Sequence, residues 1–139
     1  KLIKLFVMEA IAKMKNIHLS SRKMIFVIDS VRGKSVDEAL AILKFSKREA
    51  SEMVEKLLLS AVANWENKLD MMYNADEYEL YVKEIFSDEA GMLKRFRPAP
   101  HGRAHRIRKR MNHLTVVLDN KVEIETEVEE VIDNENIEE

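Results

Sequence analysis

Basic side chains crowd into one short segment of the chain. Positions 94 to 110 hold eight lysines and arginines and no acidic residue: Lys94, Arg95, Arg97, Arg103, Arg106, Arg108, Lys109 and Arg110. In an extended strand, residues two apart share a face at a spacing of about 6.6 Å, which would align Arg106, Arg108 and Arg110. This spacing is close to the step between phosphates along a nucleic-acid strand, and guanidinium groups bind phosphate bidentately. The segment therefore predicts binding to a polyanion.

An ordinary solvated surface and a localisation signal are the alternative interpretations of such a run. An exposed face usually mixes both signs of charge, whereas this segment excludes acids in a chain with 35% charged residues. Contact with RNA or DNA is therefore the favoured interpretation. Electrostatics alone does not choose between the two polymers.

Metal binding and catalysis are the competing chemistries. His101 and His105 are four residues apart, which suits zinc on a helix, but Pro100 and Gly102 disfavour a helix and the neighbouring cations oppose a metal ion. The chain has no cysteine, which excludes thiolate ligands and cysteine nucleophiles. Carboxylates between positions 66 and 79 have no accompanying nucleophile or phosphate-binding loop. We expect no metal, no cofactor and no catalytic residue; a small enzyme is the third-ranked alternative.

The elements that position the basic segment must come from a small domain. A length of 139 residues with 46% hydrophobic residues fits one core, and no run of 18 apolar residues predicts a membrane span. The apolar start of the chain is interrupted by Lys4 and ends at Glu9, which disfavours a secretion signal. Met8 is one candidate for the initiating residue, and trimming of a precursor is the other explanation.

Charge is segregated along the chain. Residues 119–139 hold ten acids and one base, whereas residues 1–118 hold 22 bases and 15 acids. This asymmetry favours an anionic partner for the body and a solvated acidic tail. Val122, Ile124 and Val128 alternate with glutamates and permit an edge strand, but repulsion among the acids favours a disordered extension. One hypothesis is that the tail competes with RNA for the basic segment.

Three helices are predicted before position 70, after a strand over residues 10–19. Ser20 or Ser21 can cap a helix over 22–31 that stops at Gly33, and Ser35 opens a second helix that runs to about Leu43. Ser46 to Glu49 repeats the capping pattern before the longest helix. Its apolar stripe has steps of three and four residues: Ala50, Met53, Val54, Leu57, Leu58, Ala61, Val62, Trp65 and Leu69.

Extended segments follow these helices. Leu80 to Phe86 predicts a strand, and residues 93–118 predict two extended runs around a turn at 98–102. Two prolines exclude a helix at this turn, where Gly102 can adopt a positive φ. The fold class is therefore α+β, with about three helices on a small antiparallel sheet and a long protruding hairpin over about 80–118.

Several motifs, in the same order and spacing, resemble the large-subunit ribosomal protein L twenty-two family over about residues 9–118. They are Arg32-Gly33-Lys34-Ser35 with the helix after it, Leu93-Lys94-Arg95-Phe96-Arg97-Pro98, Gly102-Arg103-Ala104-His105-Arg106 with the next four residues, and His113-Leu114-Thr115-Val116-Val117. The chain departs from the usual pattern at Ala99 and Pro100, at Ser21, at Met111-Asn112 and at Trp65.

The resemblance implies a structural, ribosome-bound protein of the cytoplasm or of an organelle. Its implied partners are large-subunit ribosomal RNA, neighbouring ribosomal proteins and the nascent polypeptide, with no homo-oligomer. The implied RNA contacts are the eight bases above together with Arg22, Lys23, Arg32, Lys34 and His113. The implied tip at the polypeptide exit tunnel is Pro98, Ala99, Pro100, His101 and Gly102. A free-standing RNA-binding or RNA-chaperone module is the alternative function. We expect one domain over 1–118, followed by the acidic tail over 119–139.

Overall fold

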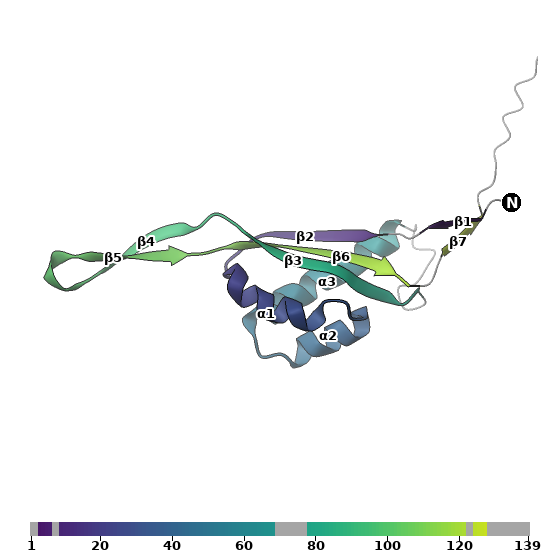
Figure 1. Cartoon of the computed structure of the whole chain (residues 1–139), viewed down its shortest axis with the longest axis horizontal. Coiled ribbons are helices and arrows are strands. Elements are labelled where there is room, and N and C mark those ends of the chain that lie inside the picture. Colours follow the sequence, from purple (N-terminus) through teal and green to yellow (C-terminus); the bar gives the residue numbers. More distant parts are fainter. Residues whose placement is uncertain (1–2, 7–8, 69–77, 122–123, 128–139) are drawn as a thin grey trace, which may run out of the picture.

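A three-stranded antiparallel sheet forms the centre of the molecule. The computed structural model describes residues 3–6, 9–68, 78–121 and 124–127. The sheet has the order β2 (Ala10–Ile17), β6 (Asn112–Asn120), β3 (Leu80–Glu89). The helices α1 (Ser21–Val31), α2 (Val36–Phe45) and α3 (Glu49–Lys68) lie on one side of it (Figure 1). The predicted α+β class is confirmed.

Local sequence signals explain how the first two helices begin and end. Ser20 precedes α1 in an extended conformation without a side-chain hydrogen bond, and α1 ends before Gly33, which has a φ of 74°. At the start of α2, the Ser35 hydroxyl accepts a hydrogen bond from the Glu38 N–H at 3.4 Å. Ser35 therefore satisfies one of the backbone donors that every helix N-terminus leaves unpaired, as predicted.

The predicted cap at Ser46 is wrong. The Ser46 backbone N–H donates to the carbonyl oxygens of Ile42 and Leu43, at 3.1 and 3.3 Å, so Ser46 ends α2. The α3 helix begins only at Glu49. A serine between two closely spaced helices can serve either terminus, and here the last turn of α2 claims it.

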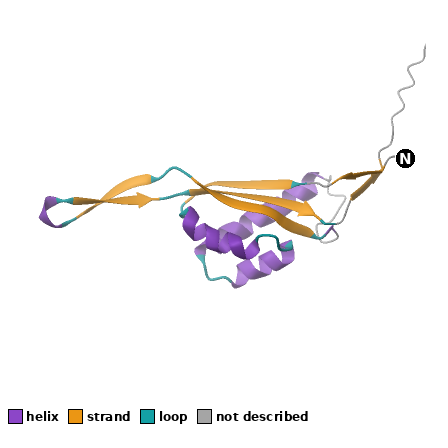
Figure 2. Ribbon diagram, in the orientation of Figure 1, coloured by secondary structure: helices purple, strands orange, loops and turns teal. Residues whose placement is uncertain are grey.

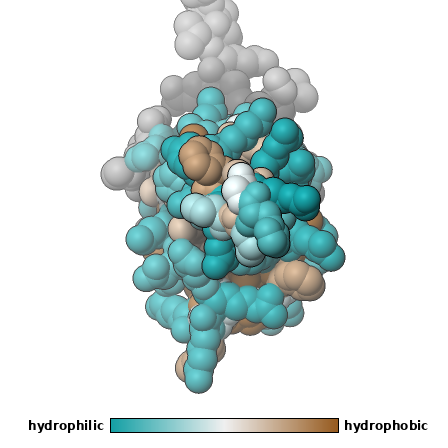
Figure 3. Space-filling view, turned by 90° about the vertical axis from the view of Figure 1, so that its left-hand side faces the viewer, coloured by the Kyte–Doolittle hydropathy of each residue, from teal (hydrophilic) through white to brown (hydrophobic). Residues whose placement is uncertain are grey.

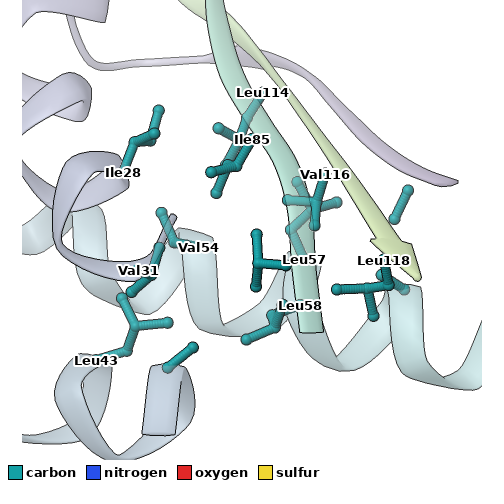
Figure 4. Close-up of a cluster of buried hydrophobic side chains, with 14 of the residues drawn as sticks. Ile28, Val31, Leu43, Val54, Leu57, Leu58, Ile85, Leu114, Val116 and Leu118 are labelled. Atoms are coloured by element: carbon teal, nitrogen blue, oxygen red, sulfur yellow. The ribbon is translucent and has the colours of Figure 1, made fainter. Parts of the chain in front are cut away.

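The hydrophobic core lies between the helices and the sheet. Side chains from α1, α3, β3 and β6 meet there, and Figure 4 shows Val54 and Leu57 of α3 beside Ile85 and Val116 of the sheet. The α3 stripe is buried largely as predicted, with Met53 and Val62 only partly covered; Leu69 lies outside the described residues. Trp65 is fully buried, with its ring centroid 5.7 Å from that of Tyr78. This core anchors both strands that lead into the hairpin.

Beyond the core, β3 and β6 continue into a two-stranded arm, β4 (Leu93–Pro98) and β5 (Ala104–Lys109), which extends far from the helices (Figure 2). The Ala90 N–H donates to the Met111 carbonyl at 3.0 Å and links the two strands at the junction. We call residues 90–111 the arm. The protruding hairpin predicted from the sequence is confirmed.

A second small sheet lies at the other end of the molecule. There β1 (Ile3–Phe6) pairs antiparallel with β7 (Ile124–Glu127). Residues 124–127 therefore form a strand, as the alternation permitted, and the favoured prediction of a disordered extension is wrong for them. Residues 128–139 lie outside the described part. None of the helices in the described ranges is long and apolar enough to cross a membrane.

Candidate nucleic-acid interface

The arm turns at a tip made of Pro98 to Gly102. The Ala99 N–H donates to the Arg103 carbonyl at 2.8 Å, and Pro100–Gly102 form a single 3-10 turn. Gly102 has a φ of 67°, which confirms the conformation predicted for it, and His101 has a φ of 61°. The left-handed conformation at His101 was not predicted, because only glycine adopts this region without steric cost.

The strand register assigns each arm side chain to one of two faces. Residues directly opposite each other in an antiparallel ladder project from the same face. The first face holds the pairs Lys94 with Arg108, Phe96 with Arg106, and Pro98 with Ala104. The second face holds Leu93 with Lys109, Arg95 with Ile107, and Arg97 with His105. Each face therefore carries three lysines or arginines.

The predicted row of three arginines is corrected by this register. The β5 strand ends at Lys109, so Arg110 lies beyond it at the junction with the sheet. Its guanidinium is 3.8 Å from a carboxylate oxygen of Glu89. Arg106 and Arg108 do share a face, and the third cation of that face is Lys94 from the opposite strand.

The bases of the arm are exposed and largely without acidic partners. All residues of β4 and β5 are exposed. Within the described ranges, the Arg110–Glu89 contact is the only salt bridge made by an arm base. Viewed end-on from the arm side, the surface is mostly hydrophilic (Figure 3). Because like charges this close repel one another, the arm is suited to a partner that supplies negative charge.

The predicted contact residues of the body have different surroundings. Arg22 and Lys23 are exposed on α1, and Lys34 is partly buried beside β3. Arg32 contacts Asp29 at 2.9 Å and donates to the Ile85 carbonyl at 3.3 Å, which ties α1 to β3. The His113 Nδ1 accepts a hydrogen bond from the Asn16 N–H at 3.1 Å, so its Nε2 is the nitrogen that remains for a donor role.

Two aromatic side chains beside cations were missed by the sequence reasoning. The Arg48 guanidinium lies 5.4 Å from the centroid of the Phe26 ring, within the range of a cation–π contact. Phe96 lies in the middle of the basic arm and is 77% exposed. A phenylalanine between Arg95 and Arg97 was the available signal for the second of these.

One cluster of paired charge in the body contrasts with the arm. Lys83 lies at a β-bulge of β3 and contacts both Glu9 and Asp119, the latter at 3.0 Å. Hydrogen bonds to Glu9 and then to Asp119 raise the pKa of Lys83 above its ordinary value. The Asp119 carboxylate, which is almost fully buried, also accepts a hydrogen bond from the Asn120 N–H. Lys83 thereby links β3 to β6 and to Glu9, the residue that precedes β2.

The acidic residues of β7 lie far from the arm. Glu125 and Glu127 pair with the β1 strand, at the end of the molecule opposite the tip (Figure 1). The hypothesis of competition between tail and RNA therefore depends on residues 128–139, which lie outside the described part.

Comparison with known proteins adds the family. The family model for ribosomal protein L22p/L17e matches residues 12–119. A large ribosomal subunit protein uL22 from Christiangramia forsetii is 60% identical over 109 residues, which cover 78% of this chain and 80% of the relative. Those from Flavobacterium johnsoniae and Porphyromonas gingivalis are 59% and 56% identical, and each comparison covers 78% of this chain and 79% of the relative. The range matched by the family model includes the whole arm, and the chain therefore belongs to the ribosomal protein L22p/L17e family.

Proposed function

We propose that the arm binds large-subunit ribosomal RNA by neutralising its phosphates from two faces. As a member of a large-subunit ribosomal protein family, the chain is a structural component of the ribosome and not an enzyme. The observation that carries the RNA-binding proposal is the arm itself, because all residues of β4 and β5 are exposed and residues 94–110 hold eight bases and no acid. A slender ribbon with three cations on each face fits between RNA segments better than against one flat surface.

The tip is proposed to reach the passage through which the nascent polypeptide leaves. It is the part of the arm farthest from the body, and residues 98–102 carry no lysine, arginine or acid. Cations resume on both sides, at Arg97 and Arg103. This arrangement suits a tip that emerges from surrounding phosphates into an open space. In the family that the chain resembles, an arginine usually follows this proline, whereas Ala99 and Pro100 stand here. Contact at the tip would therefore depend on shape and on His101.

The body supplies a second set of proposed RNA contacts. Arg22 and Lys23 have no acidic partner within the described residues and can bind phosphate directly. Arg32 is partly neutralised by Asp29, so its proposed contribution is smaller. Lys34, beside β3, and His113, near the start of the central strand β6, are proposed as further contacts. The domain organisation also stays a proposal, with one unit over 1–118 and an acidic tail over 119–139.

Co-sedimentation with large subunits tests the proposal. Residues 91–110 would be replaced by Asn-Gly, a two-residue turn that can join Ala90 to Met111 because these residues already hydrogen-bond across the strands. We expect the full chain to stay with large subunits through a high-salt wash and the armless variant to be released.

Two outcomes would contradict this proposal. If the armless variant stays with large subunits through the same salt wash as the full chain, the arm is not the element that binds the chain to the subunit. Release of the full chain by modest salt would favour a free-standing RNA-binding module, since simple phosphate contacts weaken by orders of magnitude as salt rises. Circular dichroism of both proteins would confirm that the body is folded.

A further inference from the structure

Phe96 is the most exposed of the large hydrophobic side chains of the arm. It is 77% exposed, whereas Leu93 and Ile107 on the other face are 40% and 39% exposed. An aromatic ring in this position gains little from burial within the protein, because the two-stranded arm has no core to cover it. Most of the ring surface is therefore free for a partner.

Cations surround this ring on its own face. Arg106 lies directly opposite Phe96, and Lys94 with Arg108 forms the adjacent pair. Directly opposite Cβ atoms in such a ladder are about 4.5–5.5 Å apart, and diagonal neighbours remain within reach of long side chains. The three cationic groups can therefore hold phosphates on the flanks of anything that covers the Phe96 ring. The next pair of this face toward the tip is Pro98 with Ala104, whose side chains are small and uncharged. The ring can therefore be approached from the tip side.

We propose that Phe96 is a stacking platform for an unpaired RNA base, whose neighbouring phosphates are bound by Arg106, Arg108 and Lys94. This inference rests on the proposed RNA-binding function and adds to it a contact with the face of a base. Aromatic rings beside cations are the common way in which proteins bind single-stranded nucleic acid. Paired RNA hides its base faces within the helix, so the platform requires a flipped or looped nucleotide.

The two faces of the arm thereby differ in what they recognise. The second face carries Arg95, Arg97 and Lys109, but its apolar residues are aliphatic and about half as exposed as Phe96. It can neutralise phosphates, but it has no phenyl ring on which a base could stack. His105 on that face lies opposite Arg97, and its imidazole is the smaller ring. The first face therefore combines charge with stacking.

Binding of the purified full chain to three probes tests the platform. The probes are single-stranded oligoadenylate, duplex RNA and inorganic polyphosphate, which has the charge but no base. We expect Phe96→Leu to weaken oligoadenylate binding by about 5- to 150-fold, the range measured for one stacked base. Polyphosphate and duplex binding should be unchanged, because no cation is removed. Phe96→Trp should restore oligoadenylate binding.

Matched variants separate this inference from the proposed function. Ile107→Leu on the second face should leave all three affinities unchanged. Arg106→Ala should lower the affinity for all three probes, since it removes a positive charge. The platform is refuted if Phe96→Leu changes no affinity, or if it lowers the affinity for polyphosphate as much as that for oligoadenylate. In either case, a loss of affinity with Arg106→Ala would still support RNA binding by the arm. Weaker binding of Phe96→Leu to an acidic peptide, with oligoadenylate binding intact, would assign Phe96 to a protein partner and also refute the platform.

Discussion

The body and the arm use the same residue types in opposite ways. In the body, apolar side chains are buried between sheet and helices, and Lys83 and Arg32 are each held by carboxylates. In the arm, Phe96 is exposed, and the bases of β4 and β5 have no acidic partner within the described residues. A two-stranded hairpin is only marginally stable alone in water. The body therefore provides the stability, and the arm provides charge that awaits a partner.

Removing core volume should show the largest effect, and only on stability. Leu58 is 1% exposed, and Leu58→Ala should lower the free energy of unfolding by about 2–5 kcal/mol. Urea denaturation measures this loss. RNA affinity, measured where the variant is still folded, should stay unchanged. A comparable loss of RNA affinity in the folded variant would break the division between body and arm.

Removing arm charge should have the reverse effect. Replacing Arg106, Arg108 and Lys94 by alanine should weaken RNA binding roughly a hundredfold, if each contact contributes about 1 kcal/mol. The slope of log affinity against log salt should become shallower by about two to three units. Filter binding across a salt series measures both, and the melting temperature of the body should be unchanged.

A triple variant of the body is the matched control for that charge change. The control replaces three exposed lysines of the body by alanine: Lys13, Lys15 and Lys56. Like the arm variant, it loses three positive charges. We expect this variant to retain most of the salt slope. Equal slopes for the two triple variants would mean that net charge, and not the arm, determines binding.

Breaking the paired charge of the body should have an intermediate effect. Lys83→Met leaves the buried Asp119 without its cation and should lower the melting temperature at neutral pH. Because the pKa of Lys83 is raised in the folded state, its stabilisation is fully present below the unfolded-state pKa of about 10.4 and decreases as the pH rises above it. Thermal melts of both proteins should therefore converge at high pH. A wild-type-like melting temperature at neutral pH would contradict the pairing.

Straining the tip should have the smallest effect. Gly102→Ala places a side chain at a φ of 67° with no atom within 4 Å, so the cost is conformational, about 1–2 kcal/mol, and local to the arm. Hydrogen exchange should become faster in β4 and β5 and remain unchanged in the body. Gly91→Ala is the control, since Gly91 has no positive φ. Equal effects of the two variants would show that strain at the tip is not the cause.

The sequence predicted those features that depend on local pattern. The α3 stripe, the Ser35 cap and the turn at Gly102 follow from periodicity and side-chain type, and the structure confirms all three. Ser46 was misassigned because the same residue type suits the end of one helix and the start of the next. Local pattern does not determine which neighbouring element uses a polar side chain.

Features set by strand register were beyond the sequence. Lys83 is separated in sequence from Glu9 by 74 positions and from Asp119 by 36 positions, so no local signal indicates this cluster. The predicted row of arginines wrongly includes Arg110, because β5 ends at Lys109, which pairs with Leu93. Phe96 was seen only as part of a family motif, and its place among three cations required the cross-strand pairs.

A structure of a large ribosomal subunit that contains this chain tests the central claim most directly. We predict RNA phosphates within hydrogen-bond distance of arm bases on both faces, with the tip beyond them. An arm that lies in solvent, or that is covered by acidic protein side chains with no RNA beside it, would contradict the account.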